Sequence, residues 1–325
     1  AGNTAVLKPS EMTPHSSKLM KEMLGEYFPL EYIAVIEGEA ETTQSLIKAN
    51  FDYVFFTGST EVGRSVMKTA SETLTPVTLE LGGKSPTIVA EDADLVKAAV
   101  RIAWGKAVNA GQTCIAPDYV LVHESVKNRF IVLLQQAFVK LYGENIFNND
   151  DFPSIINEKH FKRLVALLEN EEIVFGGEFS EGKLKIAPTI VGNVAWDSPL
   201  MQEEIFGPIL PIMEFDNLED AISEINKGSK PLALYLFTTS KEKEDKVLRD
   251  ISFGGGCIND TIMHLVTNHM PFGGVGESGM GRYHGKASFD TFSNYKSILK
   301  KSNLIDIPLR YPTHKNLKLL KKFMR

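Results

Sequence analysis

The chain carries a cysteine, Cys114, in a setting suited to nucleophilic chemistry. Apolar residues at helical spacing mark residues 94–108, and residues 119–122 have the composition of a strand. Cys114 therefore lies on a short turn that is fastened at both ends, where a thiol is held rigidly and can still be reached. Because a free cysteine more often packs as a small hydrophobe, the turn alone leaves both interpretations open.

A carboxylate upstream, Glu80, favours the chemical interpretation. It lies in the apolar, strand-like run at residues 77–81, and Gly82 and Gly83 follow that run. Burying a charge without a partner is costly, so Glu80 either pairs with a cation or stands at the strand's end with a raised pKa and serves as a base. The two glycines favour the base, because they allow another backbone or a ligand to come close.

A third segment, residues 56–64, is typical of a phosphate-binding helix start. The strand before it ends at Gly58, which lets a ligand approach the backbone, and Ser59 can cap the next helix. The first N–H groups of such a helix favour a phosphate, although an ordinary capped helix fits the same residues. A G-x-G-x-x-G pattern at residues 274–279 follows Pro271, which breaks any preceding strand, so we interpret it as a glycine-rich loop near the substrate.

Strand-like and helix-like segments alternate along residues 1–82, which we interpret as one domain. The expected strands are residues 5–8, 32–38, 53–58 and 77–81, and the expected helices are residues 14–27, 39–49 and 60–71. Apolar strands separated by helices predict a parallel sheet with helices on both faces. Ligands bind such sheets at the carboxyl ends of the strands, where Lys8, Gly58 and Glu80 all lie.

Residues 83–285 alternate again and form a second expected domain around the cysteine turn. Strands are expected near Thr87 and at residues 119–122, 173–175 and 233–238, and helices at residues 94–108, 126–141, 159–170 and 218–226. Residues 286–325 form a C-terminal segment with an expected subunit-contact strand and a basic tail. The pattern predicts an α/β protein.

Five long motifs resemble those of the aldehyde dehydrogenase superfamily, and their wording is similar to its class 3 branch. In chain order they are LELGGKSP, RIAWGKAVNAGQTCIAPDY, MQEEIFGPILPI, KPLALYLF and NDTIMHLVTNHMPFGGVGESGMGRYHGKASFDTFS. The resemblance runs from Ala1 to about residue 300. It implies two doubly wound parallel-sheet domains of the aldehyde dehydrogenase type, with the first domain incomplete because the family's N-terminal part is missing before Ala1.

The resemblance implies NAD(P)-dependent oxidation of an aldehyde to a carboxylic acid through a cysteine thiohemiacetal and a thioester. Cys114 would be the nucleophile, hydride would pass to the nicotinamide, and Glu80 would activate the water that hydrolyses the thioester. A free thiol with a pKa of about 8.5 is only a few per cent ionised at neutral pH, so the site must lower that pKa or pass the proton to a base. No metal is needed, and the seven histidines have no metal-ligand spacing.

The resemblance also assigns binding residues. Those assigned to the cofactor are Lys8, Glu11, Gly58, Ser59, Gly63, Glu204 and Phe206, and Phe272 is assigned to the substrate site. Glu11 can accept hydrogen bonds from the ribose hydroxyls but repels a 2′-phosphate, whereas the charge of Lys8 tolerates one. We therefore expect NAD to be preferred and NADP to be used.

Two features depart from the family pattern. The family's second oxyanion donor, an asparagine side chain, would precede Ala1, so the backbone N–H of Cys114 is the donor among these residues. We therefore expect the 325 residues alone to be inactive or nearly so. Tyr283 stands where many other classes carry a glutamate, so no proton-relay role is transferred to it.

Composition sets the wider expectations. A length of 325 residues with 43% hydrophobic residues predicts two globular domains, and the net charge of −6 with scattered basic residues argues against a nucleic-acid groove. We expect the basic tail to be a solvated end or a subunit contact rather than a membrane anchor. Cys114 and Cys257 are too few for a disulfide scaffold, so we expect Cys257 to pack inside and the protein to be cytoplasmic. By resemblance it would be a homodimer.

Three alternatives stay open. A cysteine hydrolase would need a histidine partner and would leave the phosphate-binding segment idle. A reductase of acyl phosphates shares the fold and the thiol chemistry but has no need of Glu80 for hydrolysis. A non-catalytic structural protein derived from the enzyme would have no reason to keep Cys114 and Glu80 together.

Overall fold

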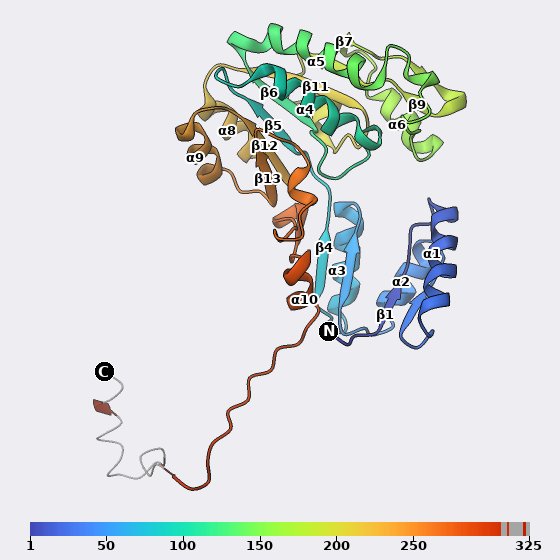
Figure 1. Cartoon of the computed structure of the whole chain (residues 1–325), viewed down its shortest axis with the longest axis vertical. Helices are drawn as coiled ribbons and strands as arrows, with labels where there is room; N and C mark the ends of the chain where they lie inside the picture. The colour runs from blue at the N-terminus through green and yellow to red at the C-terminus, as the bar shows by residue number, and fades with distance from the viewer. Residues whose placement is uncertain (307–310, 312–320, 323–325) are drawn as a thin grey trace. The chain divides into compact units, whose positions relative to one another are not determined.

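The computed structural model describes residues 1–306, 311 and 321–322 of the 325-residue chain. The chain forms two units, Ala1–Phe292 and Ser293–Arg325. All helices and strands considered below belong to the first unit (Figure 1). In the second unit, residues 293–306 form neither a helix nor a strand in this single chain, and most of the basic tail lies outside the described residues.

The largest element is a seven-stranded sheet with the order β13-β12-β5-β6-β11-β10-β7. Its strands are β5 (Pro86–Val89), β6 (Tyr119–His123), β7 (Glu172–Phe175), β10 (Thr189–Gly192), β11 (Ile209–Phe215), β12 (Ala233–Phe237) and β13 (Gly255–Ile258). All neighbours pair in parallel except β7, which is antiparallel to β10. A parallel sheet must be covered by helices on both faces, and its central strands β5, β6 and β12 are accordingly almost wholly buried.

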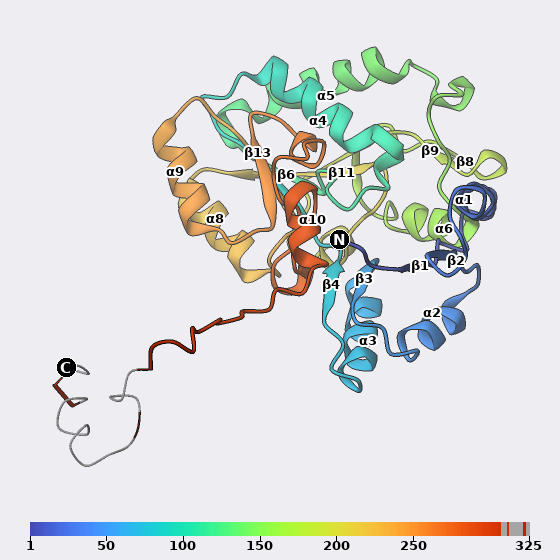
Figure 2. The same ribbon diagram turned by 60° about the horizontal axis from the view of Figure 1, so that its bottom comes forward.

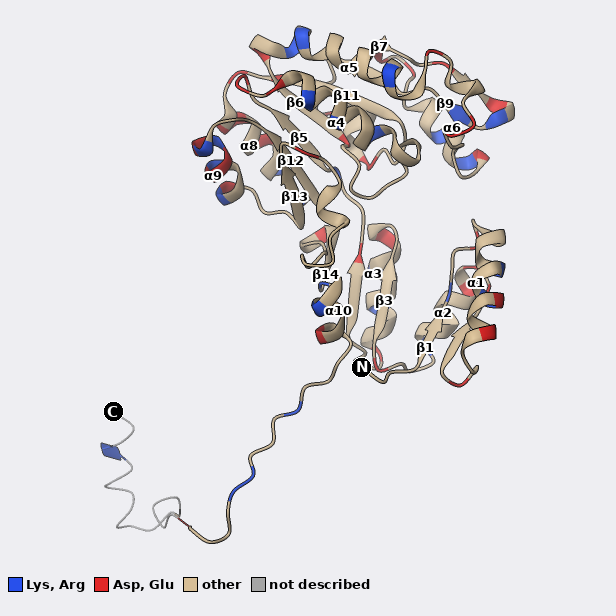
Figure 3. Ribbon diagram, in the orientation of Figure 1, with Lys and Arg blue, Asp and Glu red and all other residues tan. Residues whose placement is uncertain are grey.

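Helices surround this sheet as the alternating pattern predicts. They are α4 (Leu95–Ala107), α5 (Lys127–Tyr142), α6 (Glu158–Ala166), the short α7 (Pro199–Gln202), α8 (Leu218–Lys227) and α9 (Lys241–Asp250). Figures 1 and 2 show α4 beside α5, and α8 beside α9 near the edge formed by β12 and β13. The apolar stripe expected on α4 is confirmed, because Leu95, Ala98, Ala99 and Ile102 are all buried in the core. Acidic and basic residues lie close to one another along α9 (Figure 3).

The N-terminal strands differ from the single sheet that their alternation predicts. β1 (Ala5–Leu7) and β2 (Ile33–Val35) form a parallel pair of their own. β3 (Val54–Thr57) and β4 (Val77–Glu80) pair in parallel within a separate sheet, which β14 (Gly279–Met280) joins antiparallel to β4. The sequence could not reveal β14, because it is a two-residue strand that pairs some 200 residues away.

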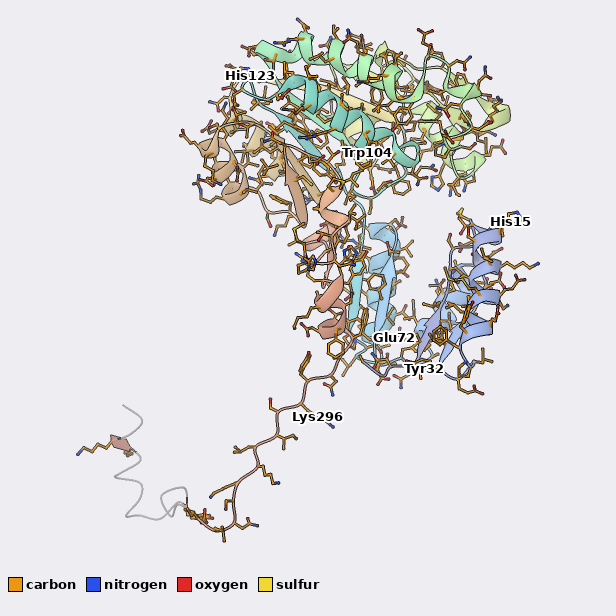
Figure 4. The ribbon with its side chains drawn as sticks, viewed as in Figure 1. His15, Tyr32, Glu72, Trp104, His123 and Lys296 are labelled. Atoms are coloured by element: carbon orange, nitrogen blue, oxygen red, sulfur yellow. The ribbon has the colours of Figure 1, made fainter. Side chains whose placement is uncertain are left out.

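Three helices accompany these strands, namely α1 (Pro14–Tyr27), α2 (Ala40–Ile47) and α3 (Thr60–Ser71), and α10 (Gly285–Thr291) closes the unit. Figure 4 labels Glu72 at the end of α3 and Trp104 on α4. A small core of Ile47, Val66, Ala70, Leu79 and Leu81 joins α2, α3 and β4. Among the described residues, we find no helix with both the length and the apolar character needed to cross a membrane.

Candidate active site

The cysteine turn follows α4 directly. The backbone of Asn109, Ala110 and Gly111 is left-handed, with φ of 51°, 50° and 74°, so the chain reverses before it reaches Cys114. The side chain of Gln112 fixes the turn by donating to the carbonyl oxygens of Asn109 at 3.2 Å and Ser154 at 3.1 Å. The expectation that the thiol lies on a fastened turn between α4 and β6 is confirmed.

Cys114 is half-buried and packs against the core of the seven-stranded sheet. Burial raises the pKa of its thiol to about 12, and the carboxylates of Glu204 and Glu80 raise it further. The two backbone N–H groups at Cys114 and Ile115 oppose this only in part. The thiol is therefore protonated at neutral pH, and a base must take its proton before or during any attack.

Glu80 is the last residue of β4 and only 4% exposed. Neither of its carboxylate oxygens has a hydrogen-bond partner. Burial raises the pKa of Glu80 to about 7, and the charge of Arg282 limits the rise. Glu80 forms no ion pair with any residue that the structure describes, so of the two interpretations the ion pair is not observed and the carboxylate keeps both oxygens available.

Glu204, on the loop after α7, acts electrostatically on the same thiol. Burial and the nearby Asp118 raise the pKa of Glu204 to about 8, while the Gly83 N–H, Lys106 and Lys84 oppose the rise. Its Oε2 lies 1.9 Å from the position that a Cβ would occupy at Gly82, so only glycine fits there. The glycine that follows Glu80 thus makes room for another carboxylate.

A buried ion pair holds the loop that carries Glu204. Lys84 and Asp118 are paired, and Lys84 also donates to the carbonyl oxygens of Leu200 at 2.7 Å and Glu203 at 3.0 Å. Asp118 accepts from the backbone N–H of Ile205 at 3.0 Å. The loop is therefore bound to the start of β5 and the start of β6.

Two neighbouring groups were not singled out from the sequence. Lys106 is fully buried, its Nζ has no partner, and burial lowers its pKa to about 8. The hydroxyl of the buried Tyr235 donates to the carbonyl oxygen of Ile115 at 2.6 Å, next to the nucleophile. In the sequence, both residues are recognisable only as polar side chains within apolar segments. That pattern does not indicate which distant residues they contact.

The segment predicted to bind phosphate is next to Glu80. The N–H of Gly58 donates to the Glu80 carbonyl oxygen at 3.0 Å, and the Ser59 hydroxyl caps α3 by accepting from the Val62 N–H at 3.3 Å. Gly63 is buried against Leu81, whose Cδ2 would lie 2.4 Å from a Cβ at that position. The start of α3 and the end of β4 are thus held together, which places the predicted anion site beside the end of β4.

Lys8 and Glu11 form an ion pair at the end of β1. The Lys8 ammonium lies 3.0 Å from Glu11 Oε2 and donates to the Gly38 carbonyl oxygen at 2.8 Å. The pKa of Glu11 is lowered by its own backbone N–H and by Lys8. None of these contacts involves the cysteine turn, so the pair is a separate part of the candidate site.

Phe206 and Phe272 occupy different settings. Phe206 follows Glu204 closely, has a left-handed backbone with φ of 50°, and is 39% exposed. Phe272 is buried, pairs through its backbone with Tyr283, and its ring stacks on His284 with 5.5 Å between centroids. Burial raises the pKa of Tyr283, and the charges of Glu80 and Cys114 raise it further.

The remaining expectations concern cysteine and metals. Cys257 lies on β13, partly buried against the core, with its sulfur 3.5 Å from His264 Nδ1. Among the described residues, no group of three or more His, Cys, Asp and Glu side chains could hold a metal ion.

Comparisons with known proteins bear on the whole of this arrangement. The family model described as "Aldehyde dehydrogenase family" matches residues 1–298. The 4,4'-diaponeurosporen-aldehyde dehydrogenase of Staphylococcus aureus is 52% identical over 328 residues, which cover 100% of this chain and 72% of that protein. Aldehyde dehydrogenase family 3 member A2 of Mus musculus is 47% identical, with 98% of this chain and 66% of that protein covered.

Two further matches bear on assembly and fold. The Rattus norvegicus protein named "Aldehyde dehydrogenase, dimeric NADP-preferring" is 46% identical over 94% of this chain and 67% of its own length. A solved structure described as the substrate bound state of Staphylococcus aureus AldH superimposes with a TM-score of 0.97 at 51% identity, covering 100% of this chain and 71% of that one. The chain thus spans about two thirds to three quarters of the length of these proteins.

Proposed function

Because the chain belongs to the aldehyde dehydrogenase family, whose members are NAD(P)-dependent oxidoreductases, we propose that the whole protein oxidises an aldehyde with Cys114 as nucleophile and Glu80 as base. One observation carries this proposal. The half-buried thiol of Cys114 occurs together with the buried carboxylate of Glu80, whose two oxygens have no hydrogen-bond partner. Both groups have pKa values shifted by burial, as expected of groups that exchange a proton.

The first step is attack of Cys114 on the aldehyde carbon. The S–C bond forms, the carbonyl π pair moves to oxygen, and the thiol proton passes to a base. Glu80, with a pKa of about 7, is partly ionised at neutral pH and can accept that proton. The Cys114 backbone N–H, on a turn that is rigid before substrate arrives, donates to the developing oxyanion.

Oxidation and release follow on the same two residues. A bound nicotinamide would supply the hydride acceptor, so that the thiohemiacetal on Cys114 would lose hydride and become a thioester. Glu80 releases to solvent the proton that it took from the thiol, and it then takes a proton from a water molecule, whose oxygen attacks the thioester carbon while the C–S bond breaks and the sulfur regains a proton from Glu80. The carboxylic acid leaves and Cys114 recovers its thiol proton, so atoms and charges balance.

The residues present fit a nicotinamide dinucleotide. The capped start of α3 offers N–H groups to its phosphates beside Glu80, and Gly82 leaves room for the Glu204 carboxylate. Gly58, Ser59 and Gly63 would hold the phosphates, Lys8 and Glu11 the adenosine ribose, and Glu204 and Phe206 the nicotinamide end. NAD would be preferred and NADP accepted, because Lys8 and Glu11 carry opposite charges.

We also propose a substrate class, an oligomeric state and a cellular location. Phe272, with Tyr283 and His284, would give the substrate site an apolar wall, which suits an aldehyde with an apolar chain. A homodimer is supported by the relative named dimeric, and residues 286–325 would supply its subunit-contact strand. The domain division at residues 82 and 83 is supported by the two glycines between β4 and β5. Two free cysteines fit the cytoplasm, where thiols persist.

The chain's second cysteine offers a matched test of the nucleophile. Cys114→Ala should abolish NADH formation from aldehyde in the whole protein and leave cofactor binding nearly unchanged. Cys257→Ala removes a thiol of the same kind beside His264 and should keep most of the turnover. Substantial turnover by the Cys114→Ala protein would refute the proposal, and an acyl-phosphate substrate assayed in parallel would reveal the reductase alternative.

A further inference from the structure

Glu80 poses an electrostatic problem that its own neighbours on β4 do not solve. The carboxylate is almost fully buried and neither oxygen has a partner, yet a base must be ionised to act. A direct ion pair would keep it ionised but would occupy the lone pairs that a water molecule needs. A cation close by, but held by other groups, would avoid that conflict.

Arg282 occupies such a position across Gly273. Glu80 Oε1 and Arg282 Cδ lie 2.9 and 3.1 Å from the point that a Cβ would occupy at Gly273, so the absent side chain lets the two residues approach. The φ of Gly273 is 157°, which adds to the need for glycine. The Arg282 Nη1 donates to the Gly281 carbonyl oxygen at 2.9 Å and also to that of Gly274.

The guanidinium is thus fixed by the glycine-rich loop rather than by the carboxylate. The same loop is fastened to β4, because the Leu81 N–H donates to the Ser278 carbonyl oxygen at 3.1 Å and Gly279 pairs with Glu80. The distance between cation and carboxylate is therefore set by backbone. Movement of a flexible arginine side chain would not easily change it.

We propose that Arg282 is a positioning residue that keeps Glu80 ionised from across Gly273 and so sets the pH above which Glu80 acts as a base. The proposal deepens the proposed function and rests on it. It concerns the pH at which Glu80 becomes ionised, whereas the assignment of Glu80 as the base belongs to the proposed function.

The other titratable groups around Glu80 leave this role to Arg282. Cys114 faces Glu80 from the cysteine turn and Tyr283 from the segment before α10, and the pKa of each is raised, so both are neutral at neutral pH. Glu204 acts on Cys114, and burial raises its pKa to about 8. The charge of Arg282 lowers the pKa of Glu80 against the rise that burial causes.

A measurement of stability tests the proposal without any catalytic activity. Because burial raises the pKa of Glu80 to about 7, its stabilising contribution is fully present below the pKa of the unfolded chain and is lost as pH rises through the folded value. The urea midpoint difference between each protein and its Glu80→Gln form, plotted against pH, therefore reports the folded pKa of Glu80. Arg282→Gln should move this transition upward by about one pH unit.

Two variants separate charge from structure. Arg282→Lys keeps the cation but loses the guanidinium fork, and its transition should stay within a few tenths of a pH unit of the parent. Arg64→Gln removes another arginine that contacts the same loop, through Glu277, and should leave the transition in place. If Arg282→Gln does not fold, Arg282→Met provides a neutral side chain with a similar stem.

The outcomes are distinguishable from failure of the proposed function. A transition at the parent pH in the Arg282→Gln or Arg282→Met protein would overturn the role of Arg282, whatever the activity. An upward shift of the transition in Arg282→Gln, together with a transition near the parent pH in Arg282→Lys, would support the role of Arg282. This holds even if the protein turns over no aldehyde. In an active protein, the rising limb of the kcat profile should move by the same amount.

Discussion

Burial raises the pKa of both Cys114 and Glu80, with opposite consequences for their reactivity. It keeps the thiol protonated, with a pKa of about 12, and makes the carboxylate a stronger base, with a pKa of about 7. The proton of Cys114 therefore does not leave in advance. It must leave as the sulfur–carbon bond forms, which couples the nucleophile to the base in one step.

This coupling predicts a pH dependence for thioester hydrolysis. Because Glu80 must be ionised to activate water and its pKa is about 7, the hydrolysis rate should rise with pH through about 7 and then level off. Stopped-flow measurement of the hydrolysis rate across this pH range records the rise. In the Glu80→Gln protein, the residual rate should not rise with pH in this range. If the hydrolysis rate of the parent protein instead rises near the ordinary pKa of a carboxyl group, the assignment of Glu80 as the base is contradicted.

At the other end of the cofactor, Glu11 carries the prediction on selectivity. Glu11→Ser removes a carboxylate that repels a 2′-phosphate, and it also frees Lys8, whose present partner is Glu11. Two like charges about 4 Å apart cost roughly 1 kcal/mol in water and about 4 kcal/mol at an effective dielectric of about 20, so the kcat/KM ratio of NAD to NADP should fall about tenfold or more. Glu22→Ser, on the outer surface of α1, is the control. An unchanged ratio would remove Glu11 from the cofactor site.

Residue type and flanking pattern pointed to some members of the site and not to others. Cys114 and Glu80 stood out because each is a reactive group bounded by glycine and apolar runs. Arg282 and Tyr235 did not, because their roles depend on contacts with Gly273, Gly274 and Ile115 that no spacing along the chain encodes.

At the scale of elements, the cysteine turn and the loop after α7 are packed backbone to backbone. A Cβ at Gly111 would lie 2.2 Å from the Gly207 carbonyl oxygen, and Gly111 has a φ of 74°. The nucleophile and the segment carrying Glu204 and Phe206 therefore cannot move independently. Positioning of the thiol and of the nicotinamide end would be linked.

Gly111→Ala tests this contact. The added methyl group clashes with backbone, so we expect a loss of stability of about 2 kcal/mol or more and a change in the rate at which Cys114 reacts with iodoacetamide. Gly143→Ala is a matched control, since Gly143 also has a positive φ of 85° but nothing within 4 Å. It should cost only about 1 kcal/mol and leave the thiol unaffected. Equal effects at both positions would show that strain alone, without the contact, explains the loss.

Most elements followed from local pattern, and the exceptions have a physical cause. The helix before the thiol and the strands β5, β6, β7 and β12 lie close to where periodicity placed them. The separation of β1 and β2 from β3 and β4 was not predicted, since hydrophobic runs identify strands but not their partners. β14 escaped for the same reason, being fixed only by its pairing with β4.

On the scale of the whole molecule, the site draws on two sheets. Glu80 ends a strand of the three-stranded sheet, and Cys114 precedes a strand of the seven-stranded one. The sheets are joined through the segment that holds Gly82, Gly83 and Lys84, which contact or make room for Glu204 and its loop. The proposed chemistry would thus depend on the junction between the two sheets.

The most direct test of the account is a single-turnover experiment on the Glu80→Gln form of the whole protein, incubated with aldehyde and NAD. In the proposed mechanism Glu80 assists the attack by Cys114, and water can replace it there as proton acceptor at a lower rate, whereas hydrolysis needs the Glu80 carboxylate. We expect a slowed burst of NADH, followed by a stall, and mass spectrometry should find one acyl group on Cys114 for each NADH formed. A stalled protein that has released NADH but carries no acyl group on Cys114 would contradict it.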